Sequence, residues 1–191
     1  MVLHDLISGT PCTPLRVPEP RVRITDVVED SRTCVPGCLF IARRGTEHDA
    51  AQFVMQAVEA GAEAVLVTQG TDVASVPAHV AVLTADHTAR AGALLAERFF
   101  DEPSSDLFTA GVTGTNGKTT VTSLAQSLLN HAGVRTGLIG TVSIDDGRDV
   151  GAATLTTPPA TEISRTLATM REHACTAAML ECSSHALHQG R

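Results

Sequence analysis

The chain has 191 residues, of which 43% are hydrophobic, and its formal net charge is −7. That length suits one large domain or two small ones, and the negative charge argues against a general polyanion-binding surface. With five Phe and no Trp or Tyr, the sequence also offers few platforms on which nucleic-acid bases could stack. We therefore expect no nucleic-acid partner, and we expect any phosphate to be bound locally by a loop.

The sequence contains no run of about 18 apolar residues, and its N-terminus has no basic region ahead of an apolar stretch. We therefore expect a cytoplasmic protein that makes no membrane contact, and a monomer. The five cysteines are an odd number and are spread without the pattern of a secreted disulfide framework. We interpret Cys38, Cys175 and Cys182 as small core residues rather than metal ligands.

The first part of the chain alternates strand-like and helix-like segments after an unusual start. Residues 1–20 contain Pro11, Pro14, Pro18 and Pro20, which predicts an irregular or partly mobile lead-in. Apolar runs then predict strands, and apolar residues at helical spacing predict helices. The predicted strands are 38–42, 64–68 and 80–83, and the predicted helices are 49–60 and 88–100.

The segment Asp101-Glu102-Pro103-Ser104-Ser105 breaks this pattern and predicts a domain boundary, which gives domains at 1–104 and 105–191. Beyond it we expect strands at 107–112, 136–142 and 176–181, a helix ending before Gly133, a turn at 145–148 and a helix at 158–173. Thr157 is suited to cap that last helix, with Pro158 as its first residue. Alternating strands and helices predict an α/β fold with parallel sheets, whose ligands bind beyond the carboxyl ends of the strands.

Residues 113–120, Thr-Gly-Thr-Asn-Gly-Lys-Thr-Thr, lie between a predicted strand and a predicted helix. Glycines in such a loop let backbone N–H groups approach phosphate oxygens, and the helix N-terminus adds partial positive charge. The Lys118 amine can reach the β- and γ-phosphates, and the Thr119 hydroxyl can bind Mg²⁺. We therefore predict ATP and Mg²⁺ as cofactors and Lys118 as a catalytic residue. The predicted nucleotide-binding residues are Gly114, Thr115, Asn116, Gly117, Lys118, Thr119 and Thr120.

The spacing of this loop departs from the usual phosphate-binding pattern. Val112 occupies the position where the first glycine is expected, five residues before the Gly of Gly-Lys-Thr, and Gly111 stands one residue too early. The alternative is a glycine-rich turn that merely ends a strand. A second predicted metal ligand is Glu181, a hard oxygen ligand at the end of the strand 176–181. Its alternative is an ordinary solvated carboxylate.

Four segments carry a resemblance to a known family. They are the loop TGTNGKTT, the stretch from Asp30-Ser31-Arg32 through PGCLFIA to Gly45, the pair Thr156-Thr157 before Pro158, and ECSSHAL at 181–187 followed by Gln189-Gly190-Arg191. In this order they resemble the Mur ligase family, and the last two are similar to the branch that adds the third residue of the peptidoglycan stem peptide. The resemblance implies a small N-terminal α/β domain that binds UDP, followed by the first part of a P-loop ATPase domain with a parallel sheet.

The resemblance also implies which residues contact a UDP-N-acetylmuramoyl-dipeptide. Residues near the uridine would be Ser31, Thr46, Glu47 and His48, and those near the muramyl-peptide would be Thr156, Thr157, Ser183, Gln189 and Arg191. The alternatives are a plain helix cap for Thr157 and an ordinary chain terminus for Arg191. The chain departs from the family where Asp49-Ala50-Ala51 replaces the usual Asp-Gly-His and where Leu155 stands in a position that is often Asn.

As to activity, the resemblance implies an ATP-dependent amide ligase that adds a diamino acid to UDP-N-acetylmuramoyl-L-alanyl-D-glutamate. Family members continue past the position of Arg191 with a carbamylated lysine and a domain that receives the amino acid, so we expect the chain as given to lack ligase turnover. Two alternatives are a non-catalytic module that binds ATP and UDP-muramyl-peptide, and an unrelated P-loop ATPase. The ECSSHAL segment argues against the unrelated ATPase.

Overall fold

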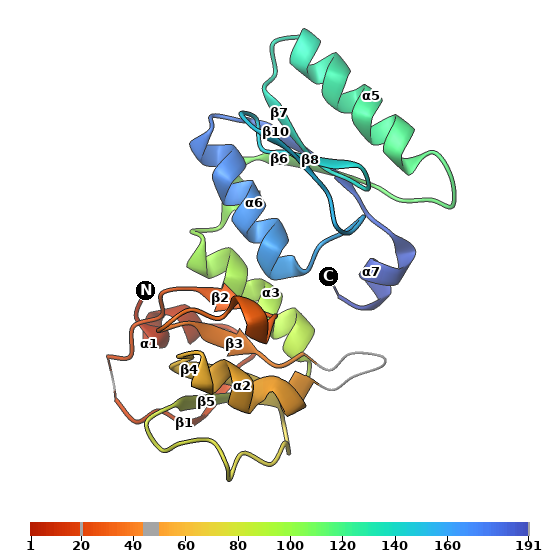
Figure 1. The fold of residues 1–191 in the computed structure, drawn as a ribbon. Helices are drawn as coiled ribbons and strands as arrows, with labels where there is room; N and C mark the ends of the chain where they lie inside the picture. Colours follow the sequence, from red (N-terminus) through yellow and green to blue (C-terminus); the bar gives the residue numbers. More distant parts are fainter. Residues whose placement is uncertain (20, 44–49, 191) are drawn as a thin grey trace. The chain divides into compact units, whose positions relative to one another are not determined.

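The computed structural model describes residues 1–19, 21–43 and 50–190, and the chain divides into two compact units, Met1–Phe99 and Phe100–Arg191 (Figure 1). This division lies between Phe99 and Phe100, earlier in the chain than the predicted boundary between residues 104 and 105. The reason lies in Arg171, whose guanidinium donates to the carbonyl of Phe100 over 3.0 Å and to the Asp106 carboxylate over 2.8 Å. Residues 100–106 therefore belong to the second unit.

The first unit is built on a five-stranded sheet with the order β1-β5-β4-β3-β2. The strands β2 to β5 are parallel, and β1 pairs antiparallel with β5 at the edge. Their bounds are β1 (Thr13–Arg16), β2 (Val27–Val28), β3 (Leu39–Ile41), β4 (Ala64–Thr68) and β5 (Ala81–Ala85). The central strands are apolar on both faces, as a parallel sheet covered on both sides requires.

Successive residues of these strands feed two separate cores, because side chains of a strand point alternately to opposite faces. Leu39 and Ile41 pack in one core with residues of α1 and α3, whereas Phe40 packs in the other with α2. The helical elements of this unit are α1 (Leu3–Ile7), η1 (Ser31–Thr33), η2 (Ala50–Phe53), α2 (Val54–Glu59) and α3 (Thr88–Phe99). The helix predicted over 49–60 is thus a 3₁₀ turn followed by a short α-helix.

The predicted irregular lead-in is wrong, because residues 1–19 contain both α1 and the edge strand β1. Leu3 and Leu6 are 1% and 0% exposed and belong to the core, and the Leu3 amide donates to the carbonyl of Val22 over 2.8 Å. Pro14 fits within β1 because an edge strand can leave one side of its backbone unpaired. The contacts that order this segment come from residues distant in sequence, which local proline content does not reveal.

The second unit has a sheet with the order β6-β10-β7-β8-β9. The strands β6 (Phe108–Val112), β10 (Ala177–Glu181) and β7 (Thr136–Ile139) are parallel, while β8 (Ser143–Asp145) and β9 (Val150–Ala152) continue the sheet in antiparallel pairs. The helices are α4 (Pro103–Asp106), α5 (Lys118–His131), α6 (Ala160–Glu172) and α7 (Ser184–His188). Figure 1 shows α5 and α6 on opposite faces of this sheet.

One predicted strand and one predicted helix of the second unit have other bounds in the structure. The strand predicted over 136–142 ends at Ile139, because the chain turns there and the Gly140 amide donates to the carbonyl of Ser143 over 3.1 Å. The helix predicted from Pro158 begins at Ala160, with Pro159 rather than Thr157 in the capping position. The Thr157 hydroxyl instead donates to the carbonyl of Glu181 over 2.7 Å.

The α5 helix leaves several of its apolar residues exposed. Its buried residue is Thr122, whose hydroxyl donates to the carbonyl of Lys118 over 2.6 Å. Its apolar stripe faces solvent, with Val121, Leu124 and Leu128 exposed by 52%, 57% and 61%.

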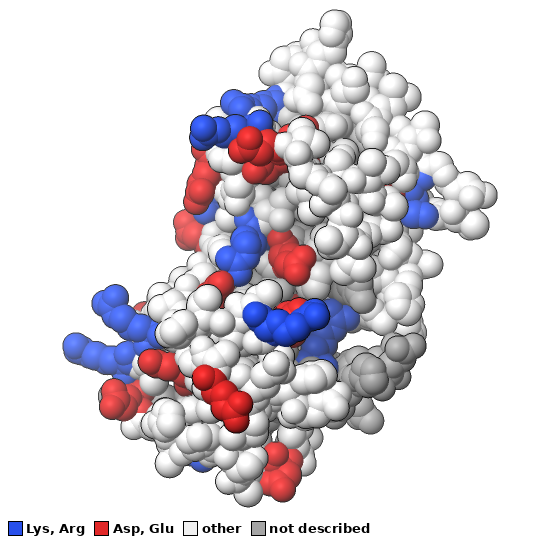
Figure 2. Space-filling view, viewed as in Figure 1, with Lys and Arg blue, Asp and Glu red and all other residues white. Residues whose placement is uncertain are grey.

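In the face shown in Figure 2, basic and acidic side chains are interspersed among a largely uncharged surface. None of the helices in the described ranges is long and apolar enough to span a membrane.

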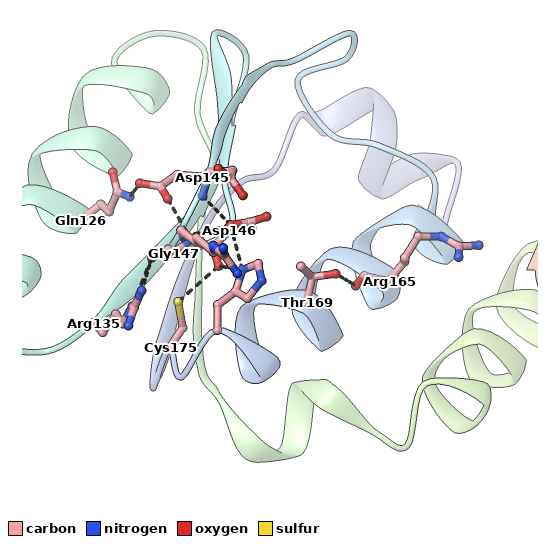
Figure 3. Close-up of polar contacts among 11 residues, drawn as sticks. Gln126, Arg135, Asp145, Asp146, Gly147, Arg165, Thr169 and Cys175 are labelled. Atoms are coloured by element: carbon pink, nitrogen blue, oxygen red, sulfur yellow. Dashed lines mark hydrogen bonds and ion pairs between the residues drawn. The ribbon is translucent and has the colours of Figure 1, made fainter.

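The turn between β8 and β9 is held by a polar cluster (Figure 3). One oxygen of Asp146 accepts from the amides of Arg148 and Asp149 over 2.9 and 2.8 Å, and it contacts the His173 ring nitrogen at 3.0 Å. Arg135 donates to the carbonyl of Gly147 over 2.6 Å. The backbone amide of Asp149 is the largest cause that holds the pKa of the Asp146 carboxyl below its usual value, and the amide of Arg148 and the His173 ring act in the same direction, against the raising effect of desolvation.

We expect Asp146→Asn to change how the stability of the second unit depends on pH. A carboxyl whose pKa is lower in the folded than in the unfolded chain stabilises the fold above its unfolded value of 3.8, and this contribution is lost as pH falls through the folded pKa. Urea unfolding should therefore show a wild-type advantage over the variant at neutral pH that shrinks below 3.8. Glu172→Gln, at an exposed position of the same unit, is the control for loss of one charge. A constant difference across this range would contradict the prediction.

Candidate functional site

The loop between β6 and α5 turns through two glycines with positive φ angles. Gly114 and Gly117 have φ angles of 150° and 81°, a region that side-chain-bearing residues rarely adopt. Gly117 immediately precedes α5, and residues 113–117 are exposed. The loop therefore presents backbone N–H groups and the N-terminus of a 14-residue helix to solvent.

Lys118 is the first residue of α5, and its Nζ lies over the loop, donating to the carbonyl of Gly114 over 2.8 Å. This bond holds the amine beside the backbone amides that would surround a phosphate. An incoming phosphate oxygen is a stronger acceptor than a neutral carbonyl, so the amine can exchange partners on binding. The arrangement fits the cationic role that the sequence predicts.

Glu181 lies next to this loop because β10 is the direct neighbour of β6, with Glu181 in register with Val112. Its side chain is only 2% exposed, and one carboxylate oxygen, Oε2, accepts from the Thr119 hydroxyl over 2.9 Å. The alternative of an ordinary solvated carboxylate does not match this burial. The structure thus brings together the two side chains predicted as metal ligands.

Thr141 is a residue of this site that the sequence reasoning missed. Its amide donates to Oε1 of Glu181 over 2.8 Å, and its hydroxyl donates to Oε2 over 3.0 Å. The preceding Gly140 makes this approach possible, because a Cβ there would lie 2.5 Å from Oε1. A glycine followed by a threonine at the carboxyl end of a predicted strand is the signal that could have identified it.

The donor set fits Mg²⁺. A hydroxyl and a carboxylate oxygen 2.9 Å apart are both hard ligands of the kind this ion prefers. Within the described ranges no three His, Cys, Asp or Glu side chains form a metal-binding group. A metal held by Thr119 and Glu181 would therefore complete its shell with phosphate and water oxygens, as Mg²⁺ commonly does.

The predicted threonine pair of the second unit lies next to Glu181, and the predicted residues Ser183 and Gln189 lie at the two ends of α7. The hydroxyls of Thr156 and Thr141 are 3.1 Å apart, and the Thr157 hydroxyl accepts from the Ser183 amide over 3.0 Å. The Ser183 hydroxyl caps α7 by accepting from the amide of Ala186 over 3.2 Å. Gln189 follows α7 as its half-buried C-cap residue.

The candidate site of the first unit is described only in part. Ser31 begins the turn η1 and is 7% exposed, and its hydroxyl donates to Oε1 of Gln56 on α2 over 2.8 Å. The adjacent Asp30 caps the turn, and its ion pair with Arg32 lowers the pKa of the Asp30 carboxyl. The predicted residues Thr46, Glu47 and His48, and Arg191 in the second unit, lie outside the described residues.

The fold and the loop together define an α/β protein with a glycine-rich loop between a strand and a helix and a buried carboxylate at the end of the adjacent strand. Residues 23–100 match the model described as Mur ligase family, catalytic domain, and residues 112–191 match the Mur ligase middle domain. The chain belongs to the Mur ligase family. This confirms the resemblance seen in the sequence and removes the unrelated P-loop ATPase from the alternatives.

Relatives with the same printed name match the whole chain. The UDP-N-acetylmuramoyl-L-alanyl-D-glutamate–2,6-diaminopimelate ligases of Synechococcus elongatus and Listeria monocytogenes are 40% and 37% identical, each over 100% of this chain but over 39% and 38% of their own lengths. A solved structure of a ligase with this name has a TM-score of 0.68 at 27% identity, covering 87% of this chain and 33% of its own. The chain thus spans well under half of the length of these relatives.

Proposed function

We propose that the chain is the nucleotide-binding and acceptor-binding part of an ATP-dependent ligase of peptidoglycan synthesis. The acceptor would be UDP-N-acetylmuramoyl-L-alanyl-D-glutamate, and the names of the relatives favour 2,6-diaminopimelate as the diamino acid. One observation carries the proposal: the phosphate loop, Glu181 and the pair Thr156-Thr157 lie at one end of one sheet and are joined by hydrogen bonds.

The proposed reaction transfers the γ-phosphoryl group of ATP to the terminal carboxylate of the acceptor, and the amine of the diamino acid then attacks the acyl phosphate and displaces phosphate. Lys118 and the loop amides would bind and orient the triphosphate. Thr119 and Glu181 would hold Mg²⁺, which when bound neutralises charge on the phosphate oxygens. Preorganised positive groups of this kind are the main electrostatic contribution to phosphoryl transfer.

The threonine pair supports a place for the acceptor beside the triphosphate. Thr156 and Thr157 precede α6, and both are tied to Glu181, Thr156 through Thr141 and Thr157 through the Glu181 carbonyl. Hydroxyls at this position can orient the oxygens of a sugar, peptide or carboxylate. Holding the acceptor carboxylate next to the γ-phosphate converts a bimolecular step into an effectively unimolecular one.

The test of the acceptor is a binding experiment on the 191-residue chain. Calorimetry should show saturable binding of UDP-N-acetylmuramoyl-L-alanyl-D-glutamate. In this proposal Ser31 and residues 46–48 bind the uridine side of the acceptor. We expect Ser31→Ala to weaken this binding about tenfold, the effect of losing one hydrogen bond of about 1–1.5 kcal/mol.

Thr33→Ala is the matched control, because Thr33 lies in the same turn and its hydroxyl bonds only to the backbone in the described contacts, donating to the carbonyl of Asp30 over 2.9 Å. Melting temperatures would show that both variants fold. Absence of saturable binding to the wild-type chain would refute the proposed acceptor, and equal affinities of wild type and Ser31→Ala would refute the role of Ser31.

A further inference from the structure

Thr141 occupies a central place between the two halves of the candidate site. It lies between β7 and β8, and its hydroxyl is within hydrogen-bond distance of both the Glu181 carboxylate and the Thr156 hydroxyl, at 3.0 and 3.1 Å. Glu181 faces the phosphate loop through Thr119, and Thr156 belongs to the proposed acceptor pair. Building on the proposed function, we propose that Thr141 positions Glu181 for Mg²⁺ and couples nucleotide binding to acceptor binding.

The positioning role follows from the two bonds that Thr141 makes to one carboxylate. A carboxylate that is 2% exposed must be compensated by hydrogen bonds, and its rotation decides which oxygen faces the phosphate loop. The Thr141 amide binds Oε1 and thereby leaves Oε2 directed to Thr119. Because Gly140 has no Cβ to push Oε1 away, this amide can approach to 2.8 Å.

The coupling role follows from the number of protons available. A threonine hydroxyl has a single proton, and an ionised carboxylate can only accept. The anionic Oε2 is the stronger of the two acceptors within reach of this proton. We therefore assign the Thr141 proton to Oε2 and the proton between the two threonines to Thr156. With this assignment the contacts form a directed chain, Thr156 to Thr141 to Glu181, with Thr119 donating to the same Oε2.

The direction of this chain fixes the sign of the coupling. Hydrogen bonds in series polarise one another, so donation by Thr156 strengthens the donation of Thr141 and draws negative charge away from Oε2. When an acceptor oxygen takes the Thr156 proton instead, charge returns to Oε2 and the carboxylate becomes a better Mg²⁺ ligand. The acceptor should therefore tighten the binding of Mg·nucleotide, and by reciprocity Mg·nucleotide should tighten the binding of the acceptor by the same factor.

The experiment measures this factor directly, without catalysis. The affinity of the 191-residue chain for Mg²⁺ with a non-hydrolysable ATP analogue is determined by calorimetry with and without saturating UDP-N-acetylmuramoyl-L-alanyl-D-glutamate. We expect the acceptor to tighten nucleotide binding about fivefold or more in the wild type, at the lower end of typical coupling factors. We expect a factor close to one in Thr141→Val and Thr141→Ala, and recovery in Thr141→Ser, which keeps the hydroxyl.

Thr169→Val is the matched control, because it removes a hydroxyl that bonds only within α6 in the described contacts, to the carbonyl of Arg165 over 3.1 Å (Figure 3). Melting temperatures of the unliganded variants show which of them fold. A general loss of stability would weaken the binding of both ligands without changing the factor by which the acceptor tightens nucleotide binding. A wild type that binds both ligands with no mutual effect, or a Thr141→Val variant that keeps the wild-type factor, would overturn the coupling while leaving the proposed function standing. A wild type that does not bind the acceptor would instead refute the proposed function.

Discussion

Replacing Lys118 by alanine is expected to reduce the affinity for Mg·ATP by at least tenfold. Its Nζ lies 2.8 Å from the carbonyl of Gly114, inside the loop whose amides would surround the phosphates. A hydrogen bond to a charged group contributes about 1.5–3 kcal/mol, which corresponds to a loss of roughly ten- to more than a hundredfold. Calorimetric titration of both proteins with Mg·ATP measures this loss. Lys118→Arg keeps the charge but not the compact ammonium group, and its affinity should lie between the two.

The chain offers a second measurement of the same prediction, because Lys118 is its single lysine. Acetylation of the Lys118 amine, followed by mass spectrometry of the peptide that carries it, should be slowed by Mg·ATP. The N-terminal amine of Met1 reports the reactivity of the reagent in the same sample. Equal ATP affinity in wild type and Lys118→Ala, together with unchanged labelling in the presence of ATP, would refute the nucleotide role of this loop.

The parts of the fold that the sequence predicts well are those determined by neighbouring residues. The buried strands at 64–68 and 177–181 are short apolar runs, and the phosphate loop has a strand before it and a helix after it. Such patterns depend on side-chain periodicity within a few residues, so they need no knowledge of distant contacts. The parallel direction of these strands follows from the general rules for alternating strands and helices, whereas the direct pairing of β6 with β10, which brings Glu181 beside the loop, is seen only in the structure.

The errors share a different origin, which is dependence on contacts distant in sequence. The helix α1 is ordered by burial of Leu3 and Leu6, and β8 and β9 are only three residues long and exist by pairing with β7 and with each other. Thr157 has the residue type and position of a helix cap, yet its hydroxyl bonds to Glu181, 24 residues away. This hydroxyl donates to the backbone carbonyl of Glu181 at the end of β10, and a local sequence pattern does not contain that information.

Thr141 illustrates the same limit within the site itself. The sequence predicts Thr119 and Glu181 as metal ligands because phosphate loops and strand-end carboxylates have recognisable positions. Thr141 acts through its backbone amide as well as its hydroxyl, and any residue with an N–H could provide the first of these bonds. Its importance comes from Gly140, where the lack of a side chain lets the backbone approach a buried carboxylate. The Gly140-Thr141 pair marks the position in the sequence, but the buried carboxylate that it contacts becomes visible only once β7 and β10 are paired.

Replacing Glu181 by glutamine is expected to remove most of the Mg²⁺ dependence of nucleotide binding while preserving the fold. The Thr141 amide can only donate, so the amide oxygen of the new side chain must take the place of Oε1. The NH₂ group then faces the hydroxyls of Thr119 and Thr141, which can rotate to accept its protons. The site therefore stays satisfied but presents an NH₂ group where an anionic oxygen would bind the metal.

The measurement compares the affinity for a non-hydrolysable ATP analogue with and without Mg²⁺. In the wild type Mg²⁺ should tighten binding, and in Glu181→Gln this effect should fall about tenfold or more, equivalent to about 1.4 kcal/mol for each factor of ten. Glu172→Gln removes an exposed carboxylate at the end of α6 and should leave the Mg²⁺ effect unchanged. Equal melting temperatures of wild type and Glu181→Gln would establish that the fold is intact. If the folded variant kept the full Mg²⁺ effect, Glu181 would not be a metal ligand, and its burial beside the loop would serve only to position Thr119.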